Sequence, residues 1–139
     1  MINVAQTLTV RTQRRGLLDI TREVRGWVAV QGVATGLLTL FCRHTSASLL
    51  IQENAAREVR SDLETFFETI APEDPGRYAH DDEGPDDMPS HLRTALTGVH
   101  LCIPVVDGEL ALGTWQGIYL FEHRRRPHER LIVLQLLGS

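Results

Sequence analysis

One amphipathic helical repeat lies near the middle of the chain, between segments whose apolar residues have the spacing of strands. The repeat follows Asn54, a residue type that often caps the start of a helix, and Ala71-Pro72 ends it. Its apolar side chains recur every three or four residues, at Ala55, Val59, Leu63, Phe66, Phe67 and Ile70. We therefore predict one long helix over about 55–70 that packs one face against the rest of the protein.

The other regular segments are mostly short apolar or alternating runs bounded by turn residues, which is typical of strands. We expect strands over 4–13, Leu37–Cys42, Leu101–Val106, Glu109 to about His123, and Leu131–Leu137. Asp107-Gly108 predicts a hairpin turn between the third and fourth of them. Two further helices are expected, one from about Arg22 to near Gly32 and a short one from Pro89 to Gly98. This order of elements predicts an α+β fold.

Length and composition indicate one globular domain, which we place at residues 1–139. No run approaches the roughly 20 apolar residues of a membrane helix, and no signal peptide is recognisable, so a cytoplasmic location without a membrane partner is expected. The net charge of −4 argues against a nucleic-acid partner. The chain has no lysine, which excludes Schiff-base chemistry on that side chain. Cys42 and Cys102 lack a CxxC spacing and are expected to be reduced and buried.

The six histidines are the first candidates for metal ligands, because neutral imidazole is the commonest metal-binding side chain. No HExxH-type spacing is present, so the ligands of any metal site would come from distant segments. His44 stands out because it lies where an apolar strand meets a run of hydroxyl residues. His100 and His128 are better explained as surface or hydrogen-bonded side chains.

The segment around His44 allows several chemistries. Cys42, His44 and Ser46 share one strand face, so a zinc site or a thiolate nucleophile is conceivable, although a buried inert cysteine is the better explanation. Arg43, Thr45 and Ser46 offer the guanidinium and hydroxyl donors that phosphate oxygens need. Hydroxyls that only bond nearby backbone would have the same sequence pattern, and the two explanations stay open.

Residues 72–90 form a long segment rich in Pro, Gly and Asp, and loops of this length are usually functional or disordered. It holds the densest acidic cluster, Asp81-Asp82-Glu83 with Asp86-Asp87. Such oxygen ligands suit Mg²⁺ held together with substrate phosphates, but a solvated loop is the commoner meaning of a charge run.

Three later features have both a functional and a structural explanation. Trp115 and Gln116 could line a pocket, although a tryptophan in a strand is more often part of the core. Glu122 could be a general base or could orient a histidine, or it could be an exposed strand end. The basic residues 124–126 and Arg130 could attract a phosphorylated ligand, but a solvated turn is the simpler explanation.

Taken together, several of these segments resemble the YjbQ family, whose members are described as secondary thiamine-phosphate synthases. The resemblance runs in the same order over about residues 15–135, and its most specific parts are the HTSA and LGTWQ segments. The matching segments are His44-Thr45-Ser46-Ala47, Glu53-Asn54, Asp87 with His91-Leu92, Ile103-Pro104-Val105, and Gly108 to Gln116.

The resemblance implies an α+β fold with a mixed β-sandwich, a homotrimer, and a histidine-lined pocket that binds a divalent metal ion such as zinc or magnesium. At matching positions it implies roles for His44, His80, His91 and Glu122. The chain departs from the family pattern in two places. It reads Asp86-Asp87-Met88 where family members often have Asp-Asn, and its basic turn after Glu122 replaces a Phe-Asp-Gly-Pro-type turn.

The implied reaction joins a pyrimidine diphosphate to a thiazole phosphate and releases pyrophosphate. In this hypothesis the metal ligands are His44, His80 and His91, and Glu122 orients a ligand or acts as a base. The phosphorylated substrate would be bound by Arg43, Thr45, Ser46, Trp115 and Gln116. Two alternatives are a metal-assisted phosphate hydrolase and a non-catalytic, trimeric metabolite-binding protein.

Overall fold

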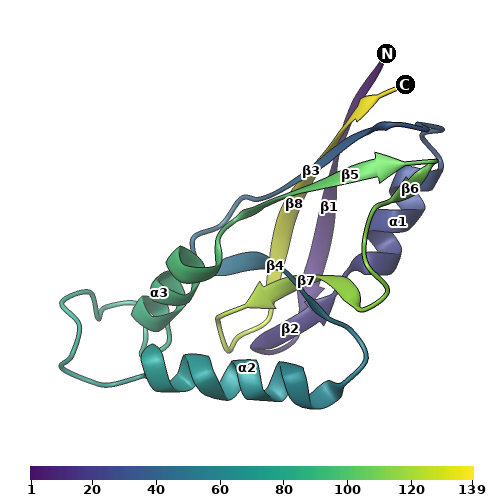
Figure 1. The fold of residues 1–139 in the computed structure, drawn as a ribbon. Helices are drawn as coiled ribbons and strands as arrows, with labels where there is room; N and C mark the ends of the chain where they lie inside the picture. The colour runs from purple at the N-terminus through teal and green to yellow at the C-terminus, as the bar shows by residue number, and fades with distance from the viewer.

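Two antiparallel sheets and three helices make up the computed structural model, which describes residues 1–139. The larger sheet has five strands in the order β1-β8-β3-β5-β6, and the smaller has three in the order β2-β7-β4 (Figure 1). The larger sheet comprises β1 (Ile2–Thr12), β8 (His128–Gly138), β3 (Gly36–Cys42), β5 (His100–Val106) and β6 (Glu109–Leu110). The smaller sheet comprises β2 (Gly16–Asp19), β7 (Gln116–Glu122) and β4 (Ala47–Glu53). The α+β prediction is confirmed, and every strand pair is antiparallel.

The hydrophobic core lies between the two sheets and extends to the first helix, α1 (Thr21–Ala29). Alternate residues of β3 and β8 face it, and Leu38, Leu40 and Leu136 are almost completely buried. Each such leucine contributes about 1.5–3 kcal/mol by leaving water. Because side chains alternate along a strand, this burial also fixes the register of β3 against β8.

The second helix, α2 (Arg57–Ile70), lies along the three-stranded sheet on the side away from the core (Figure 1). Phe67 is its buried residue and packs edge-on against Phe121 of β7, with ring centroids 5.4 Å apart. The predicted helix is confirmed, but Asn54 is not its cap. The Asn54 amide donates to the Thr114 carbonyl at 3.3 Å, and Glu53 accepts from the backbone N–H groups of Ala55 and Ala56, which precede the helix. No side chain caps the start of α2.

One predicted strand in the C-terminal half is wrong. The segment from Glu109 to His123 is not one strand, because β6 belongs to the larger sheet and β7 to the smaller. Between them Gly113 donates its N–H to the Gln116 side chain at 2.8 Å, which closes a turn. The hairpin at Asp107-Gly108 is confirmed, and both residues have the positive φ that such a turn requires.

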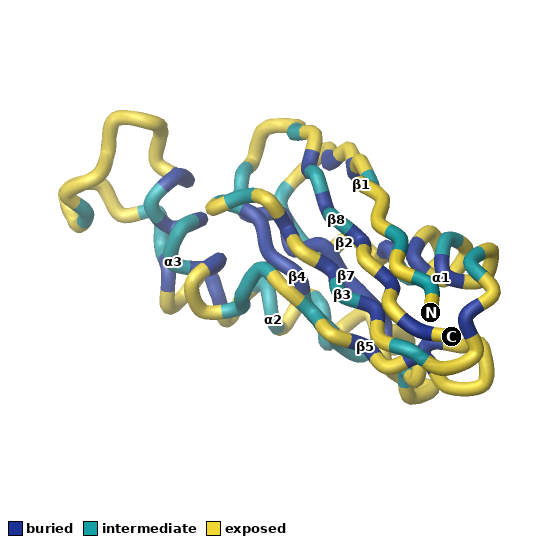
Figure 2. The backbone as a smooth tube through the Cα atoms, turned by 90° about the horizontal axis from the view of Figure 1, so that it is seen from above, coloured by how far each residue is buried: buried dark blue, intermediate teal, exposed yellow.

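The third helix, α3 (Asp87–Thr97), packs against β4 and carries the exposed segment 71–86 on its N-terminal side. Figure 2 shows this segment projecting beyond α3 with most of its length exposed. None of the three helices has both the length and the apolar character that a bilayer span requires. The N-terminal end of α3 and the projecting segment together bring imidazole and carboxylate side chains close to one another.

Candidate metal centre

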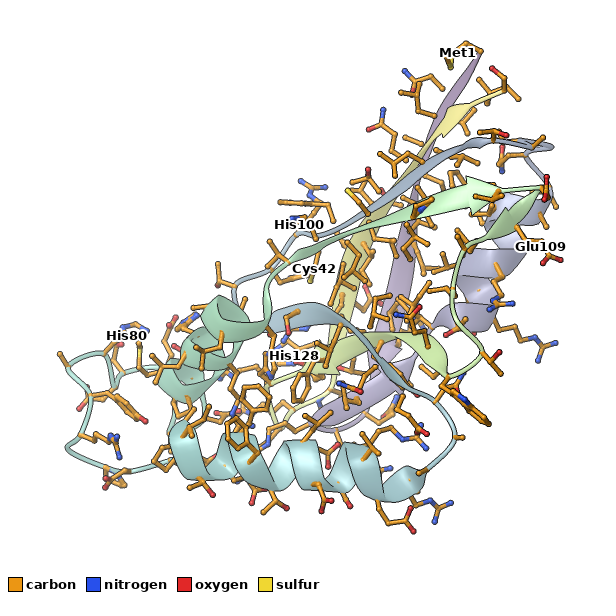
Figure 3. All side chains as sticks on the ribbon, viewed as in Figure 1. Met1, Cys42, His80, His100, Glu109 and His128 are labelled. Carbon is orange, nitrogen blue, oxygen red and sulfur yellow. The ribbon has the colours of Figure 1, made fainter.

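Four side chains at the start of α3 bring their ligand atoms within 4.8 Å of one another, and we call them the His80–His91 cluster. Asp87 and His91 are one helical turn apart on α3, so they share a face of the helix. His80 and Glu83 reach the same point from the projecting segment, and Figure 3 shows His80 beside α3. No other group of three or more such side chains in the chain has this spacing.

The centre of the cluster is the Asp87 carboxylate, whose side chain is only 5% exposed. Its Oδ2 lies 2.8 Å from His80 Nε2 and 3.2 Å from His91 Nε2, and its Oδ1 accepts from Arg124 Nη1 at 2.7 Å. Burial acts to raise the pKa of Asp87, but the contact with His80 and the charges of His91 and Arg124 outweigh it and lower the pKa. The carboxylate is therefore ionised at neutral pH.

Arginines from the turn after β7 hold the start of α3 in place. Arg124 Nε donates to Asp86 Oδ2 at 3.1 Å, and the Arg125 backbone N–H donates to the same oxygen at 2.9 Å. Asp86 is the residue before the helix, so these contacts fix the position from which Asp87 and His91 project. The basic turn is therefore a structural support of the cluster.

His91 shows why a cation fits here. Its Nδ1 lies 2.9 Å from the Thr45 carbonyl, which can only accept, so Nδ1 carries a proton. Its Nε2 faces the Asp87 carboxylate, which also only accepts. That contact is favourable only when Nε2 is protonated too, or when a metal ion lies between the two groups.

His80 has the same surroundings. Its Nε2 lies 3.0 Å from Glu83 Oε2 as well as 2.8 Å from Asp87, and its Nδ1 lies 3.5 Å from Asp82 Oδ1. The hydrogen bonds with Asp87 and then Glu83 raise the pKa of His80. Two imidazoles thus face carboxylates and carbonyls only, which is an arrangement that attracts positive charge.

The donor set of two imidazole nitrogens and two carboxylate oxygens suits zinc in four-fold coordination. Tetrahedral ligands at roughly 2.0–2.1 Å from zinc lie roughly 3.3–3.4 Å from one another. The recorded contacts of 2.8, 3.0 and 3.2 Å are slightly shorter, so a small outward movement of the side chains would accommodate the ion. Exposed Glu83 and His80 belong to a projecting segment that allows such a movement.

His44 lies outside the cluster. Its Nε2 accepts from the Leu131 backbone N–H at 2.7 Å, so this nitrogen is unprotonated and already engaged. Burial, followed by the charge of Arg130, lowers the pKa of His44. The structure therefore brings His80 and His91 together, but it joins His44 to them only through the backbone of Thr45.

Glu122 is buried in an ion pair. Arg130 donates to both its carboxylate oxygens, at 2.7 and 2.5 Å, and Thr12 Oγ1 donates at 2.7 Å. Burial acts to raise the pKa of Glu122, but the hydrogen bonds from Arg130 and Thr12 outweigh it and lower the pKa. A saturated carboxylate of low basicity is a poor general base, so this geometry favours a structural role.

The predicted phosphate-binding residues divide into two groups. Arg43 and Thr45 are exposed and Ser46 half-buried, on the segment that contacts His91. Trp115 and Gln116 lie at the opposite end of the smaller sheet, where Gln116 pairs with Glu53. The seven-residue strand β7 separates the two ends by roughly 20 Å, so one chain cannot bring both groups to one ligand.

The cysteines and remaining histidines have simple environments. Cys42 is buried, and burial raises its pKa to about 11, as expected of an inert thiol. Cys102 is exposed, so the expectation that it is buried was wrong. His100 is exposed, and His128 Nδ1 contacts the Arg126 carbonyl at 2.7 Å, so both are surface or hydrogen-bonded side chains.

Sequence reasoning overlooked the importance of Glu83 and Arg124. The sequence of the acidic segment is typical of a solvated loop, and the sequence around Arg124 is typical of a solvated turn. One signal was available, namely the spacings His80 to Glu83 and Asp87 to His91, which place pairs of metal-binding types three and four residues apart. The contact of Arg124 with Asp87 joins positions 37 residues apart and has no local signal.

Comparison with known proteins gives one consistent result. The family model described as UPF0047 protein YjbQ-like matches residues 6–139. A UPF0047 protein of Synechocystis is 50% identical over 96% of this chain and 91% of its own, and YjbQ of Escherichia coli O157:H7 is 45% identical over 96% and 97%.

Solved structures agree with the sequence comparison. A YbjQ-like protein of Sulfolobus solfataricus superposes with a TM-score of 0.87 at 25% identity, covering 99% of this chain and all of its own. A conserved hypothetical protein of Thermus thermophilus superposes with a TM-score of 0.83 at 36% identity, covering 95% of this chain and 99% of its own.

Proposed function

Because the chain belongs to the YjbQ-like family, UPF0047, we propose that it is a metal-dependent enzyme acting on small phosphorylated metabolites. The reaction we propose is the one implied by the family resemblance. It joins a pyrimidine diphosphate to a thiazole phosphate and releases pyrophosphate, as a thiamine-phosphate synthase does. The observation that supports it best is the His80–His91 cluster, in which two imidazoles and two carboxylates converge.

The cluster residues would hold the divalent ion, most naturally zinc, with His80, Glu83, Asp87 and His91 as ligands. When bound, such an ion neutralises charge on phosphate oxygens and so assists the departure of pyrophosphate. The Thr45 carbonyl keeps the proton of His91 on Nδ1 and leaves Nε2 as the metal-binding atom. Arg124 holds Asp87 by its other oxygen, which orients the remaining Oδ2 toward the imidazoles.

Arg43, Thr45 and Ser46 are the proposed phosphate contacts of the same site, because their segment touches His91. Trp115 and Gln116 can contribute only to a site of another copy, since they lie at the far end of β7. The exposed indole of Trp115, with 63% of the residue accessible, is consistent with a contact between copies. We therefore include a homotrimer in the proposal, to be tested by sedimentation.

The deciding experiment is elemental analysis of the purified protein together with an assay of thiamine phosphate formation from the two substrates. We expect about one metal ion per chain in the wild type and in a His100→Ala control, and its loss in His91→Ala. Activity should disappear with a chelator and return with zinc. If the protein binds metal but does not convert these substrates, the non-catalytic binding protein is favoured. If His91→Ala retains its metal, the metal site lies elsewhere in the protein.

A further inference from the structure

A second polar site lies on the other side of α3. It is a cavity of about 290 Å³ between α2, α3 and the turn that joins β1 to β2. Four of its eight lining residues are arginines, namely Arg14, Arg15, Arg93 and Arg125, and only one lining residue is hydrophobic. The volume is near the lower end of the roughly 300–1,000 Å³ of small-molecule sites.

Two of the four arginines have acidic partners and two do not. Arg15 contacts Glu68 at 3.3 Å and Glu73 at 3.2 Å, and Arg125 contacts the same Glu73 at 2.6 Å. The ion pairs of the chain include neither Arg14 nor Arg93. The lining also contains Glu64 and Glu68, and Glu73 pairs with two of the arginines, so four positive charges face three negative ones and positive charge is in excess at the cavity.

Arg93 is the unusual member, because it is only 3% exposed and has no carboxylate partner. A guanidinium has five N–H donors, yet the one hydrogen bond recorded for Arg93 is from Nη2 to the Ala71 carbonyl, at 3.3 Å. Its Nε is buried without any partner. Buried charges are normally paired, so an unpaired buried guanidinium calls for an explanation such as a missing anion.

Glu68 and Glu73 act on Arg93 only through their charge at a distance, because both are paired with other arginines and neither contacts Arg93. His123 is neutral there, because burial and then the charges of Arg93 and Arg130 lower its pKa to about 3. Burial, followed by the charge of Arg15, lowers the pKa of Arg93 itself, but a guanidinium stays protonated in proteins. A ligand is then the natural source of the counter-charge.

We propose that this cavity binds a phosphate group, held by the buried Arg93 with Arg14 at the exposed rim. Several guanidinium groups that line one cavity suit a tetrahedral dianion with three or four acceptor oxygens better than a flat carboxylate. The inference goes beyond the proposed function, since it needs neither the metal ion nor the His80–His91 cluster. His91 and Arg93 are two residues apart on α3, so they point to different sides of the helix.

The test is a calorimetric titration of the full chain with inorganic phosphate, in a chelator and at constant ionic strength set by chloride. The chelator removes metal, so failure of this proposal is distinguishable from failure of the proposed function. A parallel titration with glycerol phosphate, which is a phosphate ester, distinguishes free phosphate from a phosphorylated metabolite as the ligand. Binding of inorganic phosphate alone indicates a free-phosphate site, and binding of the ester indicates a phosphorylated metabolite.

Three variants make the test specific. Arg93→Met should weaken phosphate binding by at least about tenfold, as expected for loss of charge-assisted hydrogen bonds. Arg14→Ala should weaken it less, because Arg14 is exposed. Arg22→Ala, an exposed arginine on α1 that does not line the cavity, should leave it unchanged.

Two results would overturn the proposal. One is no binding of either anion to the wild type, and the other is equal weakening by Arg22→Ala and Arg14→Ala, which indicates diffuse surface charge. If Arg93→Met does not fold, nitrogen-15 spectra of the wild type decide the matter. Phosphate should then shift the signals of the Arg93 and Phe121 amides, and shifts confined to the Arg43–Ser46 segment would contradict the assignment.

Discussion

Replacing His123 by glutamine should make the stability of this protein less dependent on pH between 7 and 5. His123 is 1% exposed, its ring packs on Phe121, and its Nε2 lies 2.9 Å from Ser48 Oγ. Burial, and then the positive charges of Arg93, Arg130 and Arg15, lower the pKa of His123 from 6.5 to about 3. The imidazole is therefore neutral in the folded protein throughout this pH range.

The direction in which stability changes with pH follows from proton binding. Between pH 6.5 and 3 the unfolded chain binds a proton at His123 and the folded chain does not, so stability falls as the pH is lowered. With pKa values of 6.5 and about 3, the loss on going from pH 7 to pH 5 is about 2 kcal/mol. Glutamine has no proton to gain, and its amide can occupy the place of Nε2 beside Ser48.

The assay is urea unfolding of metal-free protein at pH 7 and pH 5. Glutamine itself will cost some stability at both pH values, but the wild type should lose about 2 kcal/mol more than His123→Gln between them. Other titrating groups, including His80, are common to both proteins and cancel in the comparison. His100→Gln, an exposed control, should behave as the wild type. Equal losses in wild type and His123→Gln would show that the imidazole is not held neutral in the core.

Three further predictions concern other parts of the fold. Glu122→Gln breaks a buried ion pair and should lower the free energy of unfolding by about 3–5 kcal/mol, whereas Glu129→Gln, in an exposed pair, should cost less than about 1 kcal/mol in the same urea experiment. Zinc affinity, measured against a competing chelator, should fall as the pH is lowered from 8 to 6. The pKa of His80 is raised, so protons compete above its ordinary 6.5, and a constant affinity would exclude His80 as a ligand. Gly108→Ala should lower the melting temperature, because φ is +81° there and strain of about 1 kcal/mol results, while Gly26→Ala, inside α1 with open space around it, should raise it. An unchanged melting temperature in Gly108→Ala would contradict the turn geometry.

The elements that were predictable from sequence are those whose own apolar pattern determines their burial. The helix over 55–70 and the strands β1, β3, β5 and β8 have such patterns. The short strands β2 and β4 do not, because their place depends on pairing with β7 on either side. The first residues of β4 also follow directly on the hydroxyl-rich segment after His44. The pattern of that segment indicates a phosphate-binding site and not the start of a strand.

The candidate site was predictable in part for the same physical reason. A histidine can be identified as a possible ligand from sequence, but its partners are set by the fold. His80 and His91 meet because α3 begins at Asp87 and the projecting segment folds back on it. His44 does not join them in this chain, because Leu131 of the neighbouring strand β8 occupies its Nε2. That hydrogen bond joins residues 87 positions apart, and no local pattern encodes it.

The acidic residues at the start of α3 and the basic turn after β7 meet in space, although they are far apart in the sequence. In the structure Arg124 Nη1 donates to Asp87 Oδ1 at 2.7 Å, and Arg124 Nε donates to Asp86 at 3.1 Å. The negative charge of Asp87 beside the imidazoles is thus matched by a positive charge from the turn. The turn therefore fixes the position and the charge balance of the cluster, and its next residue, Arg125, also lines the cavity that contains Arg93.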